Sequence, residues 1–562
     1  MKILLLLALS WAWAGELRIV EADPLLRPGL LFRCTVLYSG PDVGPCTVAA
    51  ALLQGDRVLS RLDLPLERSA LLGRPGARLA LPPPLGTGNG PPPRLAVTIS
   101  GSGANAAAER AVGTIASARQ AIEDHYQWLV ASGERDPLPW LWIEQGAALA
   151  NAATTLGNLY GLDAANTALA GWRAGTRPAL RAGATLRALR DPVDGSVQPY
   201  RLHLPEQRQG APLALLLGNH VRAPRKEHWP STHEQVILEL TSAGMTVIEA
   251  YPAGDLTWSG VAPRRARLAL EDARATLGEI ADRPLLIGTG NGAAGVTHLA
   301  AGDPERWGAV LLVDPRWDEA GSRPANLATL PIAVIGAASP AVRNWLDALR
   351  SAGGVPDLSL ANQRQAANWM LSARRTILSP STPRMMIRDT PGPAGPLLIE
   401  ELAVWGQPAE VRWQGDPLRI TTRGTARVRL SAPAPGVLID GQPPQIGATG
   451  KPPRKAWGQA CGPLAAYATA PFAIVVGTGE SEAAVTANAG LAQRFLAAWV
   501  DHAQGAPPTV TDRDFRDRDW TGRNLVLIGN PRSNHVLRDL VEGGLRLPLE
   551  WDARSVRGLG RE

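Results

Sequence analysis

The chain has 562 residues, which is more than one hydrophobic core usually serves, so we expect roughly three to four domains. Hydrophobic residues make up 45% and charged residues 19%, a balance that indicates a globular chain and excludes a disordered or fibrous one. The formal charge of +6 comes almost entirely from arginine scattered among alanine, glycine and proline, so no basic stripe predicts a nucleic-acid partner.

Residues 1–14 are predicted to form a cleavable signal peptide. Lys2 precedes an apolar run, and Ala12-Trp13-Ala14 supplies a small-x-small cleavage site. The run is shorter than the roughly 20 apolar residues that a membrane-spanning helix needs, and no later run approaches that length. A buried N-terminal helix fits less well, because strand-like sequence begins directly after the apolar run. We therefore expect cleavage after Ala14 and a secreted or periplasmic protein that does not span a membrane.

Residues 15–102 predict a small antiparallel β-sandwich, because short strand-like runs alternate with turns rich in glycine and proline. Cys34 and Cys46 flank one such turn and are expected to face each other across a hairpin, where an oxidising compartment permits a disulfide. Whether they are bonded stays open at this point. Cys461 is predicted to be a single buried thiol. The histidines are not clustered near the cysteines, so no metal site is expected.

Residues 103–185 predict a helical bridge or cap, since apolar residues recur at helical spacing from Val112 to Leu129 and a second helix is expected over 140–159. The pattern then changes to alternating strands and helices over 186–380. This alternation predicts a doubly wound, mostly parallel sheet. The expected strands cover residues 213–217, 246–251, 285–288, 309–313 and 332–335.

Two further parts complete the expected multidomain α/β protein. Residues 381–450 predict a β-rich domain, because apolar residues alternate with arginine or threonine as in half-exposed strands. Residues 451–562 predict a C-terminal α/β module, with strands at 472–476 and 524–528 and a helix over 483–500.

The segment that bears on chemistry is Gly288-Thr289-Gly290-Asn291-Gly292, where a strand runs directly into a helix. In α/β-hydrolases this turn is the nucleophile elbow G-x-S-x-G, whose strained geometry lifts a serine out of the sheet. Here both flanking glycines are present, but the central residue is Gly290, which has no nucleophile.

Three segments carry a resemblance to a known family. Residues 188–205 resemble the start of the catalytic domain of bacterial exported α/β-hydrolases of the esterase/prolyl-oligopeptidase-like family. Residues 251–258, which include Asp255 and Trp258, are similar to its Y-G-R-G-N-x-W loop, and residues 288–295 to its G-H-S-M-G-G-x-G elbow. With the C-terminal block, the resemblance covers roughly residues 185–540. It implies an α/β-hydrolase fold, no cofactor, and a peptide, ester or glycan ligand or a protein partner.

The family's catalytic triad is degenerate in this chain. A serine, an acid and a histidine should follow one another along the sequence. Gly290 stands at the nucleophile position, Ser339 stands where the acid would fall, and no histidine occurs between that position and residue 380. The sequence therefore predicts a protein that is catalytically inactive and has a binding or assembly role.

Two alternatives stay open. An active esterase or peptidase would need a non-standard nucleophile and a base such as His220 or His233, although both are expected to be surface or cap residues.

The candidate binding residues are His220, Asp255, Trp258 and Asn291. His220 follows a strand where this fold places oxyanion-hole backbone, Asp255 and Trp258 lie in the family's substrate-side loop, and the Asn291 backbone follows the nucleophile position.

The second alternative is a nucleotide-binding, Rossmann-like protein. Gly288-x-Gly290-x-x-Ala293 fits a dinucleotide fingerprint, and Asp314 ends the next strand. A Rossmann unit normally places this motif on its first strand, whereas at least two strand–helix units precede it here. The simpler interpretation is that the glycines fill a sterically tight elbow.

Overall fold

The structure is a computed structural model that divides into two compact units at Arg177–Pro178. The predicted signal peptide and Cys461 lie outside the residues that it describes. Those residues are 16–22, 25–26, 32–39, 45–54, 56–67, 77–81, 93–101, 106–111, 113–151, 156–207, 210–220, 233–252, 254, 258, 261–278, 283–317, 323–373, 384–388, 392–404, 407–415, 417–431, 436–443, 471–544, 549–551 and 556–558.

The first unit begins with two antiparallel sheets, as predicted. The strand orders are β1-β3-β6 and β5-β4-β7-β8, and β1 contacts β7 and β8 of the second sheet. Alternate residues of β4, such as Val48, Ala50 and Leu52, are buried, as expected for strands with one face on a core. The strands are β1 (Glu16–Ala22), β3 (Phe32–Ser39), β4 (Pro45–Gln54), β5 (Arg57–Glu67), β6 (Ala77–Leu81), β7 (Arg94–Gly101) and β8 (Ala106–Ala111).

The hairpin expected between the two N-terminal cysteines is wrong. Cys34 lies on β3, whose neighbours are β1 and β6, whereas Cys46 lies on β4, whose neighbours are β5 and β7. The chain changes sheets between the two residues instead of folding back on itself. A glycine- and proline-rich turn permits both connections, so local sequence did not distinguish them.

Three helices follow in the same unit: α2 (Ile115–Ser132), α3 (Pro137–Asn151) and α4 (Leu156–Arg173). Ile122, Leu129, Leu149 and Leu162 are among the residues of their shared core. The single helix expected over 140–159 is in fact divided between α3 and α4. The start of α3 combines Pro137 at its first position with Asp136, whose carboxylate accepts the backbone N–H of Leu138 at 2.9 Å.

The second unit is built on a seven-stranded sheet with the order β10-β11-β13-β12-β14-β15-β16. The last five strands in this order are parallel, which confirms the predicted mostly parallel sheet. Every residue of these five strands is buried, as expected where helices cover both faces of a parallel sheet. The strands are β10 (Gly183–Arg190), β11 (Val197–Leu204), β12 (Leu213–Leu217), β13 (Thr246–Ala250), β14 (Leu285–Thr289), β15 (Val310–Val313) and β16 (Ile332–Ile335).

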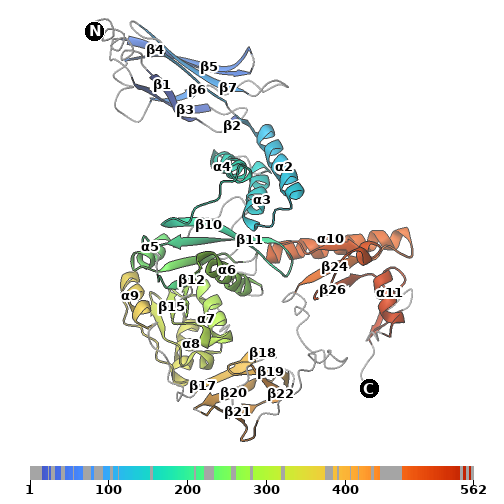
Figure 1. Cartoon of the computed structure of the whole chain (residues 1–562). Coiled ribbons are helices and arrows are strands. Elements are labelled where there is room, and N and C mark those ends of the chain that lie inside the picture. The colour runs from blue at the N-terminus through green and yellow to red at the C-terminus, as the bar shows by residue number, and fades with distance from the viewer. Residues whose placement is uncertain are drawn as a thin grey trace. The chain divides into compact units, whose positions relative to one another are not determined.

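Helices cover both faces of this sheet (Figure 1). On one face, α5 (Glu234–Ser242) and α9 (Gln363–Ala373) pack through Val236, Leu240, Ala366 and Met370. On the other, α6 (Ala262–Leu277), α7 (Gly292–Gly302) and α8 (Pro340–Ser351) join a larger core. None of the described helices combines the length and apolar character that crossing a bilayer requires.

The strand order places a topological switch point between β12 and β14. The chain passes from β12 outward to β13 on one side and then returns across β12 to form β14 on the other. In open α/β sheets, ligands bind outside the carboxyl ends of the strands at such a point. A ligand site is therefore expected at the residues that follow β12 and β14.

A small β domain follows. It contains a four-stranded sheet, β17-β20-β21-β23, and a three-stranded sheet, β18-β19-β22, around a core that includes Met386, Val411 and Trp413. The Asn326 side chain joins it to the main sheet's layer, because Asn326 accepts the N–H of Ile387 at 2.7 Å and donates to its carbonyl at 3.0 Å. The strands are β17 (Arg384–Arg388), β18 (Gly392–Ala394), β19 (Leu397–Leu402), β20 (Ala409–Gln414), β21 (Arg419–Arg423), β22 (Thr425–Leu430) and β23 (Leu438–Ile439).

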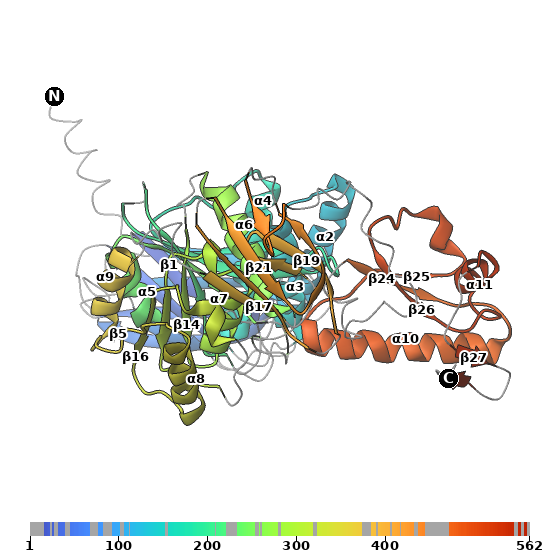
Figure 2. The same ribbon diagram turned by 90° about the horizontal axis from the view of Figure 1, so that it is seen from below.

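The C-terminal module is a parallel sheet of order β25-β24-β26 with α10 (Glu482–Ala503) alongside it (Figure 2). Its strands are β24 (Phe472–Val476), β25 (Thr509–Thr511) and β26 (Asn524–Ile528), and α11 (His535–Glu542) follows β26. Phe472 and Trp499 pack edge to face and belong to the same hydrophobic core as the seven-stranded sheet. The module is thus a continuous extension of that core.

A buried ionic cluster fixes the end of α10 to the main sheet's layer. Arg265 of α6 donates to Asp191 at 2.6 Å, to Asp194 at 3.2 Å and to the carbonyl of Ala503. The indole of Trp499 donates to the same Asp194 carboxylate at 2.8 Å. All of these side chains are at least nine-tenths buried, so each charge depends on its partners for solvation.

Candidate functional site

The candidate site is the turn between β14 and α7, at the switch point of the sheet. Gly290 adopts a positive φ of 52°, and its N–H donates to the carbonyl of Val313 at 2.9 Å. A Cβ at Gly292 would overlap the carbonyl of Leu217, so strand and helix approach too closely for a side chain. This is the tight elbow that the sequence predicted.

Asn219, which follows β12, fills the space beside Gly290. A Cβ built on Gly290 would overlap the amide group of Asn219. That amide oxygen accepts the backbone N–H of Asn291 at 3.0 Å. In α/β-hydrolases, the N–H after the nucleophile is one of the two oxyanion-hole donors. In this chain, the corresponding donor is bonded to the protein's own side chain.

His233, at the start of α5, accepts a hydrogen bond from the loop after β12, the segment that supplies the other oxyanion donor in α/β-hydrolases. Its Nε2 accepts the backbone N–H of Asn219 at 2.9 Å, and Thr289 Oγ1 lies 2.9 Å from the same nitrogen. Because Nε2 accepts a hydrogen bond, the neutral ring carries its proton on Nδ1. Burial lowers the pKa of His233, and nearby Glu249 acts in the opposite direction.

His220 lies beside His233 and is buried. Its ring centroid is 6.4 Å from that of His233 and 5.8 Å from that of Tyr251, and its Nε2 has no hydrogen-bond partner in the described part of the chain. Burial, reinforced by His233 and opposed by Glu249, lowers the pKa of His220 to about 4. His220 is therefore neutral at physiological pH. The expectation that it lies on the surface is wrong, because the turn after β12 directs it inward.

Trp258 supports the same turn from the other side. Its indole donates to the carbonyl of Gly218 at 2.7 Å, and its side chain is only 4% exposed. A Cβ at Gly295 would come within 2.6 Å of the Trp258 Cβ, so the indole also packs on α7. Asp255, the other candidate from this loop, lies outside the described residues.

Asp314 directly follows β15, and Ser339 lies between β16 and α8. Ser339 caps α8, where its hydroxyl accepts the N–H of Val342 at 3.4 Å. Asp314 accepts the N–H of Ala337 at 3.1 Å and has an unusual positive φ of 44°. Both side chains thus hold local backbone.

The structure unites Gly290, Asn291, Trp258 and His220 around one turn and adds Asn219, which sequence analysis missed, and His233, which it named only as a candidate base. Asn219 and His233 are 14 positions apart; Asn219 fills the space beside Gly290, and His233 contacts Asn219 and Thr289. Asn219 follows a buried strand, which was the one available signal. Among the described side chains, no three His, Cys, Asp or Glu groups are close enough to hold a metal ion.

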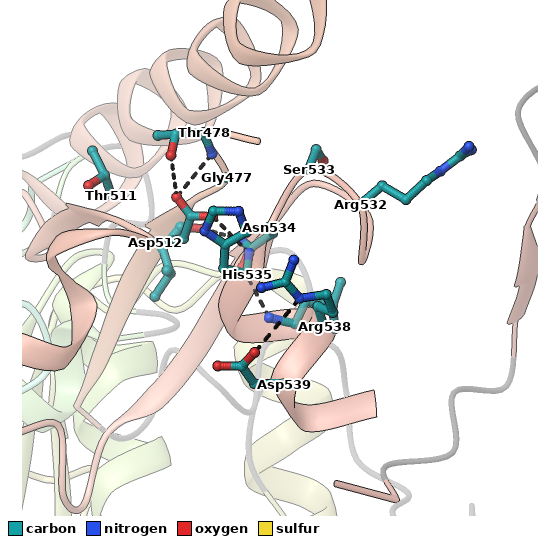
Figure 3. A network of polar contacts seen from close by, with 12 residues as sticks. Gly477, Thr478, Thr511, Asp512, Arg532, Ser533, Asn534, His535, Arg538 and Asp539 are labelled. Atoms are coloured by element: carbon teal, nitrogen blue, oxygen red, sulfur yellow. Dashed lines mark hydrogen bonds and ion pairs between the residues drawn. The ribbon is translucent and has the colours of Figure 1, made fainter. Parts of the chain in front are cut away.

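A second polar network lies at the carboxyl edge of the C-terminal sheet (Figure 3). Asp512, which follows β25, accepts the N–H and hydroxyl of Thr478 at 3.0 and 2.6 Å and the N–H of His535 at 2.7 Å. Burial alone would raise the pKa of Asp512, but these hydrogen bonds outweigh it and hold the pKa below the usual value. The Asp512 carboxylate therefore accepts hydrogen bonds from Thr478, which precedes α10, and from His535, the first residue of α11.

Comparison with solved structures finds enzymes of the α/β-hydrolase class. A ferulic acid esterase is 14% identical over 34% of this chain and 96% of its own, with a TM-score of 0.27. An S-formylglutathione hydrolase from Agrobacterium tumefaciens is 13% identical over 35% and 96%, with a TM-score of 0.26. The acylaminoacyl peptidase of Pyrococcus horikoshii is 10% identical over 34% and 40%, with a TM-score of 0.27.

No protein-family model matches the sequence, and a search of curated proteins finds no match. The chain is structurally similar to esterases and a peptidase over about a third of its length. The assignment of an α/β-hydrolase-like fold follows from the strand order and from the elbow between β14 and α7.

Proposed function

We propose that this chain is an exported, α/β-hydrolase-like protein that does not hydrolyse substrates and that acts in binding or assembly. The observation that carries the proposal is the position of Asn219. Its side chain fills the space beside Gly290, and its amide oxygen accepts the hydrogen bond of the Asn291 N–H.

The proposal follows from what hydrolysis requires. A nucleophile is absent at position 290, and the two oxyanion-type donors, Asn219 N and Asn291 N, are bonded to His233 and Asn219. Loss of one oxyanion donor lowers the rate by about 10²–10³-fold, and loss of a general base by about 10²–10⁴-fold. Together with the missing nucleophile, these losses leave no efficient route to acyl transfer.

The proposed ligand is a peptide, ester or glycan, or a protein partner, at the carboxyl edge of the parallel sheet. Asn219, Asp314 and Arg316 are exposed along this edge. The N–H of Arg316 donates to the carbonyl of Gly290 at 3.0 Å, which ties this residue to the same turn. Exposed amide, carboxylate and guanidinium groups at a switch point suit a polar ligand.

A fluorophosphonate probe tests the absence of serine-type catalysis. The full-length protein should show no labelling that heat denaturation abolishes, whereas an active serine esterase in the same experiment should be labelled. Specific, heat-sensitive labelling of this chain would contradict the proposal.

One observation favours the alternative of an active hydrolase. The hydroxyl of Thr289 lies 2.9 Å from His233 Nε2, as a nucleophile lies from its base. Against it, Thr289 is only 4% exposed, and the N–H of Asn219 already uses the lone pair of that nitrogen. If the wild type is labelled, loss of the label in Thr289→Val would assign the nucleophile to Thr289.

Export rests on the sequence of residues 1–14 and is tested separately. Expression in a bacterial host with periplasmic fractionation should yield a chain that begins at Gly15, as measured by intact mass. A chain that retains residues 1–14 in the cytoplasmic fraction would contradict export without bearing on catalysis.

A further inference from the structure

Two linked hydrogen bonds occupy the backbone N–H groups of Asn219 and Asn291 beside the Gly290 turn. His233 Nε2 accepts from Asn219 N at 2.9 Å, and Asn219 Oδ1 accepts from Asn291 N at 3.0 Å. His233 thus accepts from the backbone of the same residue whose side chain accepts from Asn291 N. A histidine accepts in this way only while it is neutral.

The charges around His233 come from several elements. Glu249 on β13 is fully buried and is bonded to His203 of β11 at 3.0 Å. His220 lies beside His233, and Glu234 follows it at the start of α5. Burial lowers the pKa of His233, and the charge of Glu249 opposes that shift.

We propose that protonation of His233 releases Asn219 and opens the donor pair at the Gly290 turn, so that a ligand oxygen takes its place. This inference concerns the regulation of the site described above and rests on its proposed role in binding. It assigns the ligand a carbonyl or carboxylate oxygen, since the two freed groups, Asn219 N and Asn291 N, are both donors.

Protonation of His233 changes which atoms donate and which accept hydrogen bonds at the turn. A proton added to Nε2 turns that nitrogen from an acceptor into a donor. The new N–H points along the direction of the former lone pair, toward Asn219 N, while Thr289 Oγ1 lies beside both ring nitrogens, 2.9 Å from Nε2 and 3.3 Å from Nδ1. The Asn219 N–H then faces another N–H and loses its partner. The positive imidazolium beside the two freed donors adds to their attraction for a ligand oxygen.

Residue-resolved hydrogen exchange measures the release directly. Burial lowers the pKa of His233, so the measurement must extend well below the ordinary histidine value of 6.5. Between about pH 7.5 and about pH 4.5, protection of Asn219 and Asn291 should fall together. Loss of one net hydrogen bond corresponds to about five- to tenfold lower protection, after correction for the intrinsic pH dependence of exchange. Gly290 is the internal control, because its N–H is bonded to the carbonyl of Val313 and not to a titrating group.

Two variants separate this release from general loosening. In His233→Gln, an amide oxygen can accept from Asn219 at any pH, so protection should be high and independent of pH. In His233→Ala, protection at Asn219 should be low at both pH values. Unchanged protection of wild-type Asn219 in acid, an equal fall in His233→Gln, or an equal fall at Gly290 would overturn the inference.

Failure of this inference differs from failure of the proposed function. Fluorophosphonate labelling at either pH would contradict the inactive assignment whatever the exchange data show. Exchange that does not respond to pH, with no labelling, would leave the inactive assignment standing and remove only the acid-dependent release.

Discussion

The amide group of Asn219 occupies the place that a side chain on Gly290 would need. Gly290→Ser should therefore introduce a hydroxyl without producing activity, because the lone pair of His233 Nε2 and the N–H of Asn291 are already used in hydrogen bonds. It should also destabilise the fold. A strained backbone position costs about 1–3 kcal/mol, and the overlap with Asn219 adds to that cost. The measurements are p-nitrophenyl acetate turnover and denaturant unfolding.

A second glycine with a positive φ allows the cost of the strained backbone to be measured separately from the overlap with Asn219. Gly278, which ends α6, has a φ of 69°, and nothing lies within 4 Å of its ideal Cβ. Gly278→Ser thus shares the conformational cost of Gly290→Ser without the overlap. If the two variants lose equal stability, Asn219 does not restrict position 290. Robust turnover by Gly290→Ser would mean that a base is already in place.

A double-mutant cycle tests the contact itself. Asn219→Ala alone should cost about 0.5–1.5 kcal/mol, the net value of the hydrogen bond to Asn291. In that background, Gly290→Ser should be less damaging than in the wild type, because the overlapping amide is gone. We expect a coupling of about 1 kcal/mol from unfolding curves of the four proteins. Strict additivity would count against direct contact.

The sequence predicted the parallel strands well because each is a continuous buried apolar run. The expected ranges 213–217 and 332–335 match β12 and β16, and the elbow at Gly290 lies where its glycines indicated. Such features follow from the residues of one segment. The α/β-hydrolase-like fold was thus accessible from local pattern.

The site's chemistry was less accessible because it depends on contacts between distant segments. The roles of Asn219 and His233 arise from a hydrogen bond across 14 positions and have no local signature. Strand β25 was missed because its three residues carry little apolar periodicity, and with it the role of Asp512. Turn residues alone also failed to show that the chain leaves one N-terminal sheet for the other between Cys34 and Cys46.

The buried imidazole of His220 makes stability depend on pH. Its ordinary pKa of 6.5 falls to about 4 in the folded protein, chiefly through burial. The unfolded chain therefore binds a proton first as the pH falls. The stabilising contribution is complete above about pH 6.5 and is lost as the pH falls toward 4, with a limit of about 3 kcal/mol.

His220→Asn removes this titration and isolates its contribution. The stability difference between wild type and His220→Asn, measured by urea unfolding, should shrink steadily from pH 6.5 to pH 4. The same substitution at His502, an exposed histidine of α10, serves as the control for unspecific effects. A difference that stays constant across this window would show that the folded protein protonates His220 as readily as the unfolded chain does.

Arg265 should be the residue on which the attachment of α10 depends most. Arg265→Met would leave the carboxylates of Asp191 and Asp194 buried without their cation and the carbonyl of Ala503 without its donor. Removing one partner of a buried ion pair costs about 3–5 kcal/mol. We expect a loss of this size in denaturant unfolding, together with faster hydrogen exchange at the C-terminal end of α10.

The neighbouring Arg264 provides a matched control on the same helix. Its guanidinium lies 4.0 Å from Asp191, too far for a hydrogen bond, and its side chain is 26% exposed, whereas that of Arg265 is 4% exposed and lies 2.6 Å from Asp191. Arg264→Met should therefore cost no more than about 1 kcal/mol, the usual range for a solvated ion pair. Equal losses in the two variants would mean that the cluster is held by the hydrophobic packing of α6. A large loss confined to Arg265→Met, with exchange increased in α10 but not in α7, would instead show that this one guanidinium couples the C-terminal module to the main sheet.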